Sequence, residues 1–254
     1  MSRLSDRRAE AQVAMMLLTR LPAGHIGSPA PRFADAAWAF PLAGLAMAAV
    51  SGAALALALA LGVPAAPAAG VALAAGVLAT GGIHEDGLAD CADGFGGGHD
   101  RARKLEIMRD SRIGSYGGLA AMLSLGLRWT SLAAIAAVAP LMAVLGLAAL
   151  AMASRAGIAV GMARLKPARS DGLGHMASGA GGWRVGVALA LGALGLATLG
   201  AAAPVVLVAI ALAQAAMAAL AIRQIGGQTG DVLGGMQQVG EIAGWLALAA
   251  WVTA

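Results

Sequence analysis

The longest uncharged stretch of the chain constrains its fold most. No Asp, Glu, Lys or Arg lies between Asp35 and His84, and the region near Pro64 divides this stretch into apolar segments 36–61 and 66–83. Each segment has close to the ~20 residues that an α-helix needs to cross ~30 Å of hydrocarbon. A backbone in lipid must satisfy its own hydrogen bonds, and no segment shows the period-two alternation of a barrel strand. The sequence therefore predicts membrane-spanning helices.

Further apolar segments repeat this pattern along the rest of the chain. They cover residues 117–138, 141–163, 185–200 and 204–222, and a short last one covers 242–253. Only 12% of the residues are charged, whereas a soluble domain carries about 25%. We therefore predict an all-α, polytopic transmembrane bundle of about six to seven spans, in one integral membrane domain over residues 1–254. Whether segment 242–253 crosses fully is left open.

The charged residues predict the topology. Apart from Arg128 and Arg155, all of them lie in the segments 1–35, 84–116, 164–184 and 223–241. The turns between these segments carry no charge, so charged and uncharged connections alternate, as successive helical hairpins require. All charged segments should then face one side, and the positive-inside rule makes that side the cytoplasm. We expect a multi-pass protein of the cell inner membrane, with residues 5–20 as an amphipathic helix at its surface.

Charge and cysteine content exclude some functions. The formal charge is +4 and the isoelectric point is about 10.2, but the basic residues form no stripe or motif for nucleic acid. Cys91 is the only cysteine, so no intramolecular disulfide can form. Lipid-facing and partner-facing helix surfaces look alike in sequence, so the oligomeric state is open and a homo-oligomer is compatible with it.

The densest acidic segment follows the second apolar stretch. Seven of the thirteen acidic residues lie between Glu85 and Asp110. On a helix, Asp86, Asp90 and Asp93 fall within about 60° of one another, and we call these three the acidic stripe. Two bare carboxylates ~4 Å apart repel by ~4 kcal/mol at an effective dielectric of ~20. A shared divalent cation would relieve that repulsion, and oxygen ligands favour Mg²⁺ or Mn²⁺. A solvated acidic helix face is the alternative.

A glycine-rich turn and a basic run come next. Glycine backbone can approach a phosphate closely, and cationic side chains add charge-assisted bonds to phosphate oxygens. The cations that we expect to bind phosphate are Arg101, Lys104, Arg109 and Arg112. No Gly-Lys-Ser/Thr is present, so the segment is not a P-loop. The basic run also serves as a positive-inside signal, and both interpretations hold together. Segment 84–116 is thus the predicted active-site loop and helix.

Other polar residues outside this segment belong to the same prediction. Arg128 lies within an apolar span, where charge is costly and usually faces a partner or cavity, and we favour contact with the anionic site over a structural ion pair. Thr229 and Asp231 lie in a glycine-rich loop on the same side, where a plain turn is the alternative. His84 and His99 are eligible metal ligands, although a lone histidine is more often a polar loop residue.

The chain resembles the cobalamin synthase family, also called adenosylcobinamide-GDP ribazoletransferases. The resemblance is dense over about 30 residues and is supported near both ends of the chain. It rests on His84-Glu85-Asp86-Gly87-Leu88-Ala89-Asp90-Cys91-Ala92-Asp93-Gly94, Gly97-Gly98, Arg101, Leu105-Glu106-Ile107-Met108-Arg109-Asp110-Ser111-Arg112-Ile113-Gly114, Leu18-Thr19-Arg20-Leu21-Pro22 and Thr229-Gly230-Asp231. Cys91 stands where many relatives have Thr, a small-for-small change.

The resemblance implies a Mg²⁺-dependent membrane enzyme. It would join adenosylcobinamide-GDP to α-ribazole, or its 5′-phosphate, and release GMP in the last stage of cobalamin synthesis. A ribose hydroxyl would attack the phosphorus on the cobinamide arm, which needs positioning and charge neutralisation. The acidic stripe would be catalytic and, with Glu85, would hold the metal; one of its carboxylates, such as Asp93, would accept the hydroxyl proton. The implied substrate-binding residues are Arg101, Lys104, Arg109, Asp110, Ser111, Arg112, Arg128, Thr229 and Asp231.

Two other classes compete with this interpretation. A CDP-alcohol phosphotransferase also places spaced aspartates at a membrane edge, but its motif requires an Arg where Asp90 follows Ala89 here. An ion-coupled transporter usually buries its polar residues near the midplane and often shows repeated halves. Here the acidic residues lie at the predicted surface, and only Arg128 and Arg155 lie deep.

Overall fold

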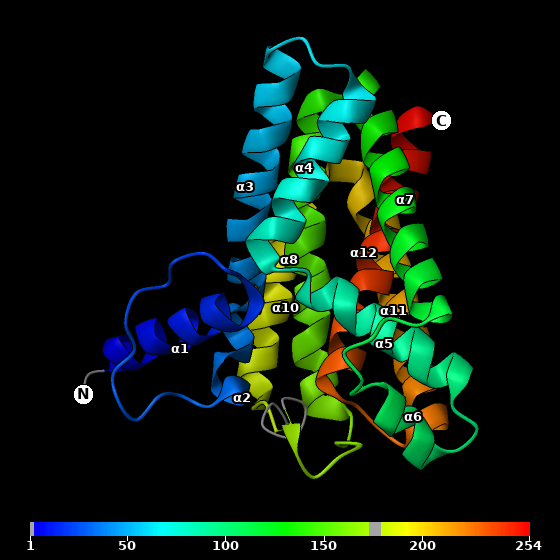
Figure 1. The fold of residues 1–254 in the computed structure, drawn as a ribbon. Helices are drawn as coiled ribbons and strands as arrows, with labels where there is room; N and C mark the ends of the chain where they lie inside the picture. The colour runs from blue at the N-terminus through cyan, green and yellow to red at the C-terminus, as the bar shows by residue number, and fades with distance from the viewer. Residues whose placement is uncertain (1–2, 173–178) are drawn as a thin grey trace.

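The structure is a computed structural model, and it describes residues 3–172 and 179–254. Most of the described residues form helices, and a long loop over residues 19–32 joins α1 to α2 (Figure 1). The helices are α1 (Arg3–Leu18), α2 (Phe33–Ala36), α3 (Phe40–Ala60), α4 (Ala65–Thr80), α5 (Ile83–Gly97), α6 (Arg101–Ile107), α7 (Ser115–Val138), α8 (Pro140–Arg164), α10 (Gly182–Ala197), α11 (Ala203–Ile225) and α12 (Gly230–Thr253), with 3₁₀ turns η1 (Ala37–Ala39) and η2 (Gly200–Ala202).

The predicted fold class, a polytopic helical bundle, is confirmed, with fewer clear spans than expected. In the described part of the chain, four helical segments are long and apolar enough to cross a membrane: Phe33–Ala60, Ser115–Val138, Pro140–Arg164 and Gly200–Ile225. A bent pair made of α4 and α5 would raise the number to five. The predicted segment 185–200 is the 16-residue helix α10, which is short for a complete crossing.

Helix α8 is the centre of the bundle. Its apolar window is 78% buried, compared with 28% for the window in α11. Helices α3, α10, α12 and α11 pack against α8, and α4 packs against α3 and α7. Pro140 and Pro204 each lie in the first turn of a helix, where the missing N–H costs no hydrogen bond. The turns predicted near these prolines are therefore found where the sequence placed them.

The last helix is longer than its apolar pattern indicated. The sequence showed only 242–253 as apolar, yet α12 runs unbroken from Gly230 to Thr253, over 24 residues. Its first half carries Gln237, Gln238 and Glu241, all of them buried. These side chains face partners inside the bundle instead of lipid. The polar first half of α12 can therefore be helical and lie in the interior of the bundle.

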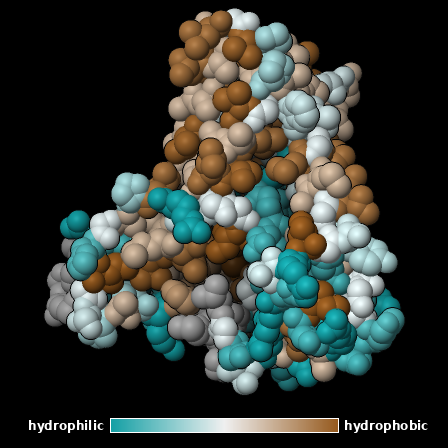
Figure 2. All heavy atoms as spheres, viewed as in Figure 1, coloured by the Kyte–Doolittle hydropathy of each residue, from teal (hydrophilic) through white to brown (hydrophobic). Residues whose placement is uncertain are grey.

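Polar and apolar residues separate along the long axis of the molecule. Figure 2 shows the hydrophobic residues over the upper part of the bundle and most hydrophilic ones at the lower end, beside α1, α5 and α6 of Figure 1. All four charged segments reach that end, apart from residues 173–178, which lie outside the described residues. The predicted grouping of the charged loops on one side is therefore seen in the structure.

The N-terminal helix lies at one side of the bundle near this polar end, against α3, and projects away from the long helices (Figure 1). Glu10 of α1 accepts a hydrogen bond from Trp38 Nε1 at 2.7 Å and lies 3.6 Å from the Arg184 guanidinium. Val13, Ala14 and Leu18 are buried against neighbouring helices. Helix α1 therefore covers part of the bundle beside the start of α5.

Candidate active site

A sharp corner between α4 and α5 directs the acidic segment. The two helices are bent by 87°, and the residues between them, Gly81 and Gly82, both have left-handed backbone (φ 70° and 72°). Side chains disfavour this conformation, and glycine adopts it at little cost. Helix α5 therefore leaves the direction of the bundle and lies across its polar end, packed on α7 and α12. We treat α5 as outside the spanning helices.

The predicted metal ligands of α5 do not all face one place. Glu85 points into the bundle, where it accepts a hydrogen bond from Arg128 at 2.8 Å. Arg128 also reaches Glu241 of α12 at 3.3 Å, and Arg155 of α8 lies 3.9 Å from the same carboxylate. These four charged side chains, from α5, α7, α8 and α12, form the buried ion network. Arg128, predicted to contact substrate, is thus a member of an interior network.

Asp93 has a second, different partner. Its carboxylate accepts hydrogen bonds from the backbone N–H of Gly114 at 2.7 Å and of Gly117 at 2.8 Å. These amides belong to the first turn of α7, where N–H groups have no partner within the helix and favour a negative charge. Asp93 therefore caps α7, and only 8% of its surface is exposed. Both of its oxygens are already used.

Asp86 and Asp90 remain available. Neither carboxylate has a side-chain hydrogen bond or ion pair with any described residue. Burial, together with the negative charges of Asp86, Asp231 and Asp93, raises the pKa of Asp90 to about 7. The structure thus brings Asp231 of α12 to the two stripe residues, and we call Asp86, Asp90 and Asp231 the acidic cluster.

A close contact between two helices makes this cluster. Gly87 lies against the first turn of α12: a Cβ there would come within 2.8 Å of the Asp231 carbonyl oxygen. Thr229 caps α12 by accepting the N–H of Val232 at 3.2 Å, and its hydroxyl donates to Asp231 Oδ2 at 3.1 Å. Thr229 and Asp231, predicted as substrate contacts, therefore lie at the start of α12 directly beside α5.

Two cations at the site were missed by the sequence analysis. Arg169 lies 3.7 Å from Asp231 Oδ2, and it is the cation whose charge acts on Asp90. Its guanidinium donates to the Leu105 carbonyl at 3.1 Å, while its buried Nε has no partner. Nothing in its spacing distinguished Arg169 from other loop cations. Arg20 had a signal, since it belongs to the segment 18–22 that supported the family resemblance.

A large cleft adjoins the acidic cluster on the side of Asp86. Its volume is about 650 Å³, and its lining combines polar and apolar groups from the end of α1, the α4–α5 corner and α5. Glu85, Asp86, Thr19 and Arg20 supply most of its polar side chains. The cleft therefore joins carboxylates to an exposed cation at the polar end of the molecule.

The predicted phosphate-binding cations lie on α6 and the loop after it, and most have partners elsewhere. Arg101 donates to the carbonyls of Ile225 and Ala168 at 2.7 and 2.6 Å, and Lys104 donates to Gln224. These bonds fasten α6 to the end of α11 and to the loop after α8. The remaining members of the predicted set are exposed or half-buried: Arg109 pairs with Asp171 at 2.6 Å, Arg112 pairs with Asp110 at 2.6 Å, and Ser111 is exposed.

The acidic cluster is not a complete metal cage. No group of three or more His, Cys, Asp or Glu among the described residues is placed to hold a metal ion by itself. Two carboxylates without partners and a third of the same charge nonetheless form an oxygen-only donor set. Such a set can share a hard divalent cation with oxygen atoms of a bound anion.

Comparisons with known proteins show which proteins the chain is similar to. A family model described as "Cobalamin-5-phosphate synthase" matches residues 10–249. Curated proteins named "Adenosylcobinamide-GDP ribazoletransferase" are similar over nearly the full length. The protein from Bradyrhizobium diazoefficiens is 47% identical, covering 96% of this chain and 94% of that one. The one from Mesorhizobium japonicum is 47% identical, covering 94% and 93%. The one from Azorhizobium caulinodans is 45% identical, covering 92% and 93%. No solved structure matches.

Proposed function

The chain belongs to the cobalamin-5-phosphate synthase family, and from that premise we propose that the acidic cluster is where it carries out its reaction. The protein is a transferase of the final stage of cobalamin synthesis, the adenosylcobinamide-GDP ribazoletransferase step. Its family membership decides against the phospholipid synthase and the transporter. The observation that carries the assignment of the site is the pair of unpartnered carboxylates, Asp86 and Asp90, beside Asp231 and the large cleft.

We propose Mg²⁺ as the cofactor, held by Asp86, Asp90 and Asp231. Mg²⁺ is usually bound by one or two carboxylates together with substrate phosphates and water, and it rarely sits in an all-protein cage. The cluster fits that description, because it supplies oxygen donors alone and leaves the remaining positions to a ligand. When bound, the ion would neutralise charge on a diphosphate. Asp93 leaves the proposed ligand set, because both of its oxygens accept hydrogen bonds at the cap of α7. Glu85 leaves it, because its Oε1 atom is paired with Arg128 in the buried ion network.

The reaction then needs no covalent intermediate with the protein, because the phosphoryl group passes directly from one substrate to the other. A hydroxyl oxygen of α-ribazole, or of its 5′-phosphate, bonds to the phosphorus on the cobinamide arm. The bond from that phosphorus to the GMP oxygen breaks, and the hydroxyl proton passes to a carboxylate of the cluster. Arg20 and Arg169 stabilise the anionic groups from two sides. Asp93 is a poor proton acceptor, because both of its oxygens already accept backbone hydrogen bonds.

We further propose that the polar end faces the cytoplasm of a cell inner membrane. The charged segments gather at one end of the bundle, and basic loops are retained on the cytoplasmic side. The nucleotide substrate and the GMP product are water-soluble groups, which fits a cleft at that end. The α1 helix would then lie along the membrane surface.

The test is GMP release by the purified protein in lipid nanodiscs. We expect release from adenosylcobinamide-GDP that depends on both added ribazole and Mg²⁺. Asp86→Asn should lower the rate at least a hundredfold, because it removes one charge from the cluster. Glu106→Gln is the matched control: this carboxylate is in the same acidic segment, is 69% exposed and pairs only with Arg103. Equal rates for wild type and Asp86→Asn would show that the reaction happens elsewhere.

A further inference from the structure

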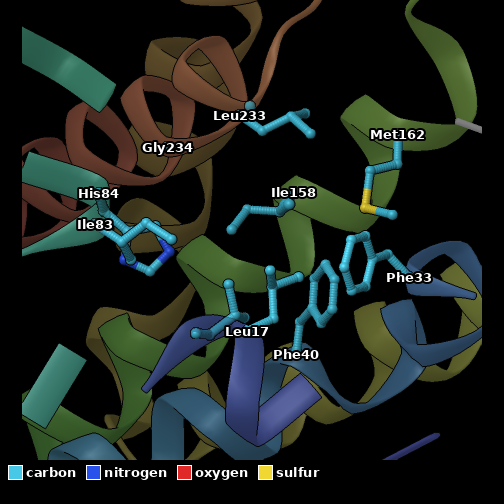
Figure 3. A pocket seen from close by; sticks show the side chains of 11 residues that line it. Leu17, Phe33, Phe40, Ile83, His84, Ile158, Met162, Leu233 and Gly234 are labelled. Carbon is cyan, nitrogen blue, oxygen red and sulfur yellow. The ribbon is translucent and has the colours of Figure 1, made fainter. Parts of the chain in front are cut away.

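A second cavity, separate from the cleft, lies between α1, α3, α5, α8 and α12. Leu17, Phe33, Phe40, Ile158 and Met162 form most of its wall, and Figure 3 shows their side chains around a common space. The cavity leaves about 60 Å³ for the centres of water-sized molecules. One water needs about 10–15 Å³ on that measure, so the space suits about four to six waters or one small aromatic group. Its wall is almost entirely apolar, which disfavours water.

One polar group reaches this apolar cavity. His84 lines it from the first turn of α5, its side chain is labelled at the edge of the space in Figure 3, and only 3% of the residue is exposed. Its Nε2 atom is buried and has no hydrogen-bond partner among the described residues. A buried polar atom without a partner costs free energy, and native structures rarely keep one without a reason. His84 also lines a smaller polar cavity beside the buried ion network. A ligand that reaches Nε2 from the apolar cavity would supply the missing partner.

The cavity is next to the proposed reaction site. Leu17 and Ile83 line both the cavity and the large cleft, so the two spaces share a wall. Gly230 lines the cavity between Thr229 and Asp231, the start of α12. A molecule that fills the cavity and continues past Gly230 therefore reaches the acidic cluster within one helical turn.

We propose that this cavity binds the aromatic base of the ribazole substrate, with His84 Nε2 hydrogen-bonded to the ring nitrogen that is not attached to the sugar. The inference rests on the proposed function, and it adds where the second substrate, the ribazole, binds. The base of a ribazole is planar and mostly apolar, with a single free ring nitrogen. It thus matches an apolar pocket, two phenylalanines and one unpartnered polar atom. The ribose then leads past Gly230 toward Asp231, which orients its hydroxyl for attack.

The first test changes the polar atom. In nanodiscs, the affinity for α-ribazole is measured by calorimetry, and the KM values for α-ribazole and for adenosylcobinamide-GDP are measured by GMP release. His84→Leu removes the hydrogen bond and should raise the Kd and KM for α-ribazole about tenfold, with an unchanged KM for adenosylcobinamide-GDP. His84→Gln places a polar atom at a similar reach and should recover most of the affinity. His84→Leu should also melt at a higher temperature, because an unpartnered buried polar group is lost.

The second test fills the space and needs no change at His84. Ile158→Phe adds a ring to the cavity wall and should weaken α-ribazole binding by tenfold or more. Ile210→Phe is the matched control. It makes the same change at a buried isoleucine of α11 that lines a different cavity, of about 260 Å³, away from the site. The control should bind α-ribazole like the wild type.

Several outcomes would overturn the proposal. One is an unchanged Kd for α-ribazole in both His84→Leu and Ile158→Phe. Another is a parallel rise in both KM values, which would indicate general damage to the site. A third is an acyl chain that co-purifies with the wild type and is displaced by Ile158→Phe without any change in α-ribazole binding. Calorimetry on the wild type keeps this test separate from the proposed function, because α-ribazole binding is measured even if no GMP is released.

Discussion

At the scale of single residues, the partners of a carboxylate decide its role. Asp90 and Asp93 are neighbours on one helix face, as the sequence predicted, yet Asp93 caps α7 and Asp90 has no partner. Spacing along a helix places residues on a face, but it does not show what the facing element offers. The start of α7, which occupies Asp93, is 21 residues further along the chain.

The two aspartates should therefore respond differently to the same change. In Asp93→Asn, an N–H₂ group meets backbone N–H donors, so the folded state should lose about 1–2 kcal/mol, the usual size of a lost helix cap. Asp90→Asn should raise the melting temperature at pH 8, because the raised pKa of Asp90 means that its ionisation destabilises the folded state, and it should weaken Mg²⁺ binding at least tenfold. Thermal melting and Mg²⁺ titration of both variants in nanodiscs provide the check. Equal losses of Mg²⁺ affinity would contradict the assignment of Asp93 to the cap.

The pKa of Asp90 predicts how metal binding depends on pH. Burial and the charge of Asp86 raise this pKa to about 7, so the carboxyl is mostly protonated at pH 6 and mostly ionised at pH 8. Mg²⁺ binds the ionised form, so its apparent affinity should rise as the pH rises through 7 and level off above it. Titration calorimetry at several pH values measures this slope. In Asp90→Asn, the Mg²⁺ affinity should no longer change with pH near pH 7. If the affinity of this variant still rises with pH there, another group releases the proton.

At the scale of elements, the direction of α5 decides which residues meet at the candidate site. The acidic segment, its helical form and its place at a membrane edge followed from the sequence. Its contact with α12 did not, because the polar start of α12 resembles a loop in hydropathy. Asp231 was found only as part of a glycine-rich stretch, and its pairing with the α5 carboxylates depends on how two distant helices pack. The cations of α6 were predicted to bind phosphate from their sequence order alone. In the structure, Arg101 and Lys104 hold α6 against the end of α11 and the loop after α8.

A methyl group between α5 and α12 should separate the carboxylates. In Gly87→Ala, the new Cβ would lie 2.8 Å from the Asp231 carbonyl oxygen, a backbone atom that cannot rotate away. The helices must move apart, and we expect a rate of GMP release at least tenfold lower, with weaker Mg²⁺ binding. Gly118→Ala is the control, because a Cβ there meets nothing within 4 Å. Wild-type rates for both variants would show that the contact does not matter.

The buried ion network joins four helices and should contribute strongly to stability. Arg128→Met leaves Glu85 and Glu241 buried without their nearest cation, and removing one partner of such a network costs about 3–5 kcal/mol. Adding Glu241→Gln to this variant removes one of the unpaired charges and should recover part of the loss. Melting temperatures of the single and double variants test this coupling. Strictly additive losses would mean that the network is not one unit.

At the scale of the whole molecule, the division into an apolar and a polar end was predictable, and the number of crossings was not. Long uncharged segments and the alternation of charged with uncharged connections extend over the whole chain. They can be recognised even where the exact ends of single helices are predicted wrongly. Apolar length predicted about six to seven spans, whereas four helical segments of the described residues, or five with the bent pair α4 and α5, are long and apolar enough to cross, and α10 is short. The length of α12 was underestimated, because the polar residues in its first half interrupt the apolar pattern although they lie inside the bundle.

The predicted orientation can be tested with single cysteines. In a Cys91→Ser background, Leu61→Cys marks the turn between α3 and α4, where Leu61 is 73% exposed. Ser170→Cys marks an exposed loop at the polar end. A membrane-impermeant maleimide added to intact spheroplasts should label the cysteine at 61, and label the one at 170 only after permeabilisation. The reverse pattern would turn the protein over in the membrane and contradict a cytoplasmic site.

The corner at Gly81 and Gly82 determines both the direction of α5 and the position of the Arg20 side chain. A Cβ on Gly81 would come within 2.5 Å of Arg20 Nε, so the backbone that turns α5 also makes room for the arginine at the mouth of the cleft. Any side chain added there would displace a positive charge from the entrance while it strained the turn. Attempts to engineer new substrate preferences from this end of the cleft would therefore have to redesign helix direction and entrance charge jointly.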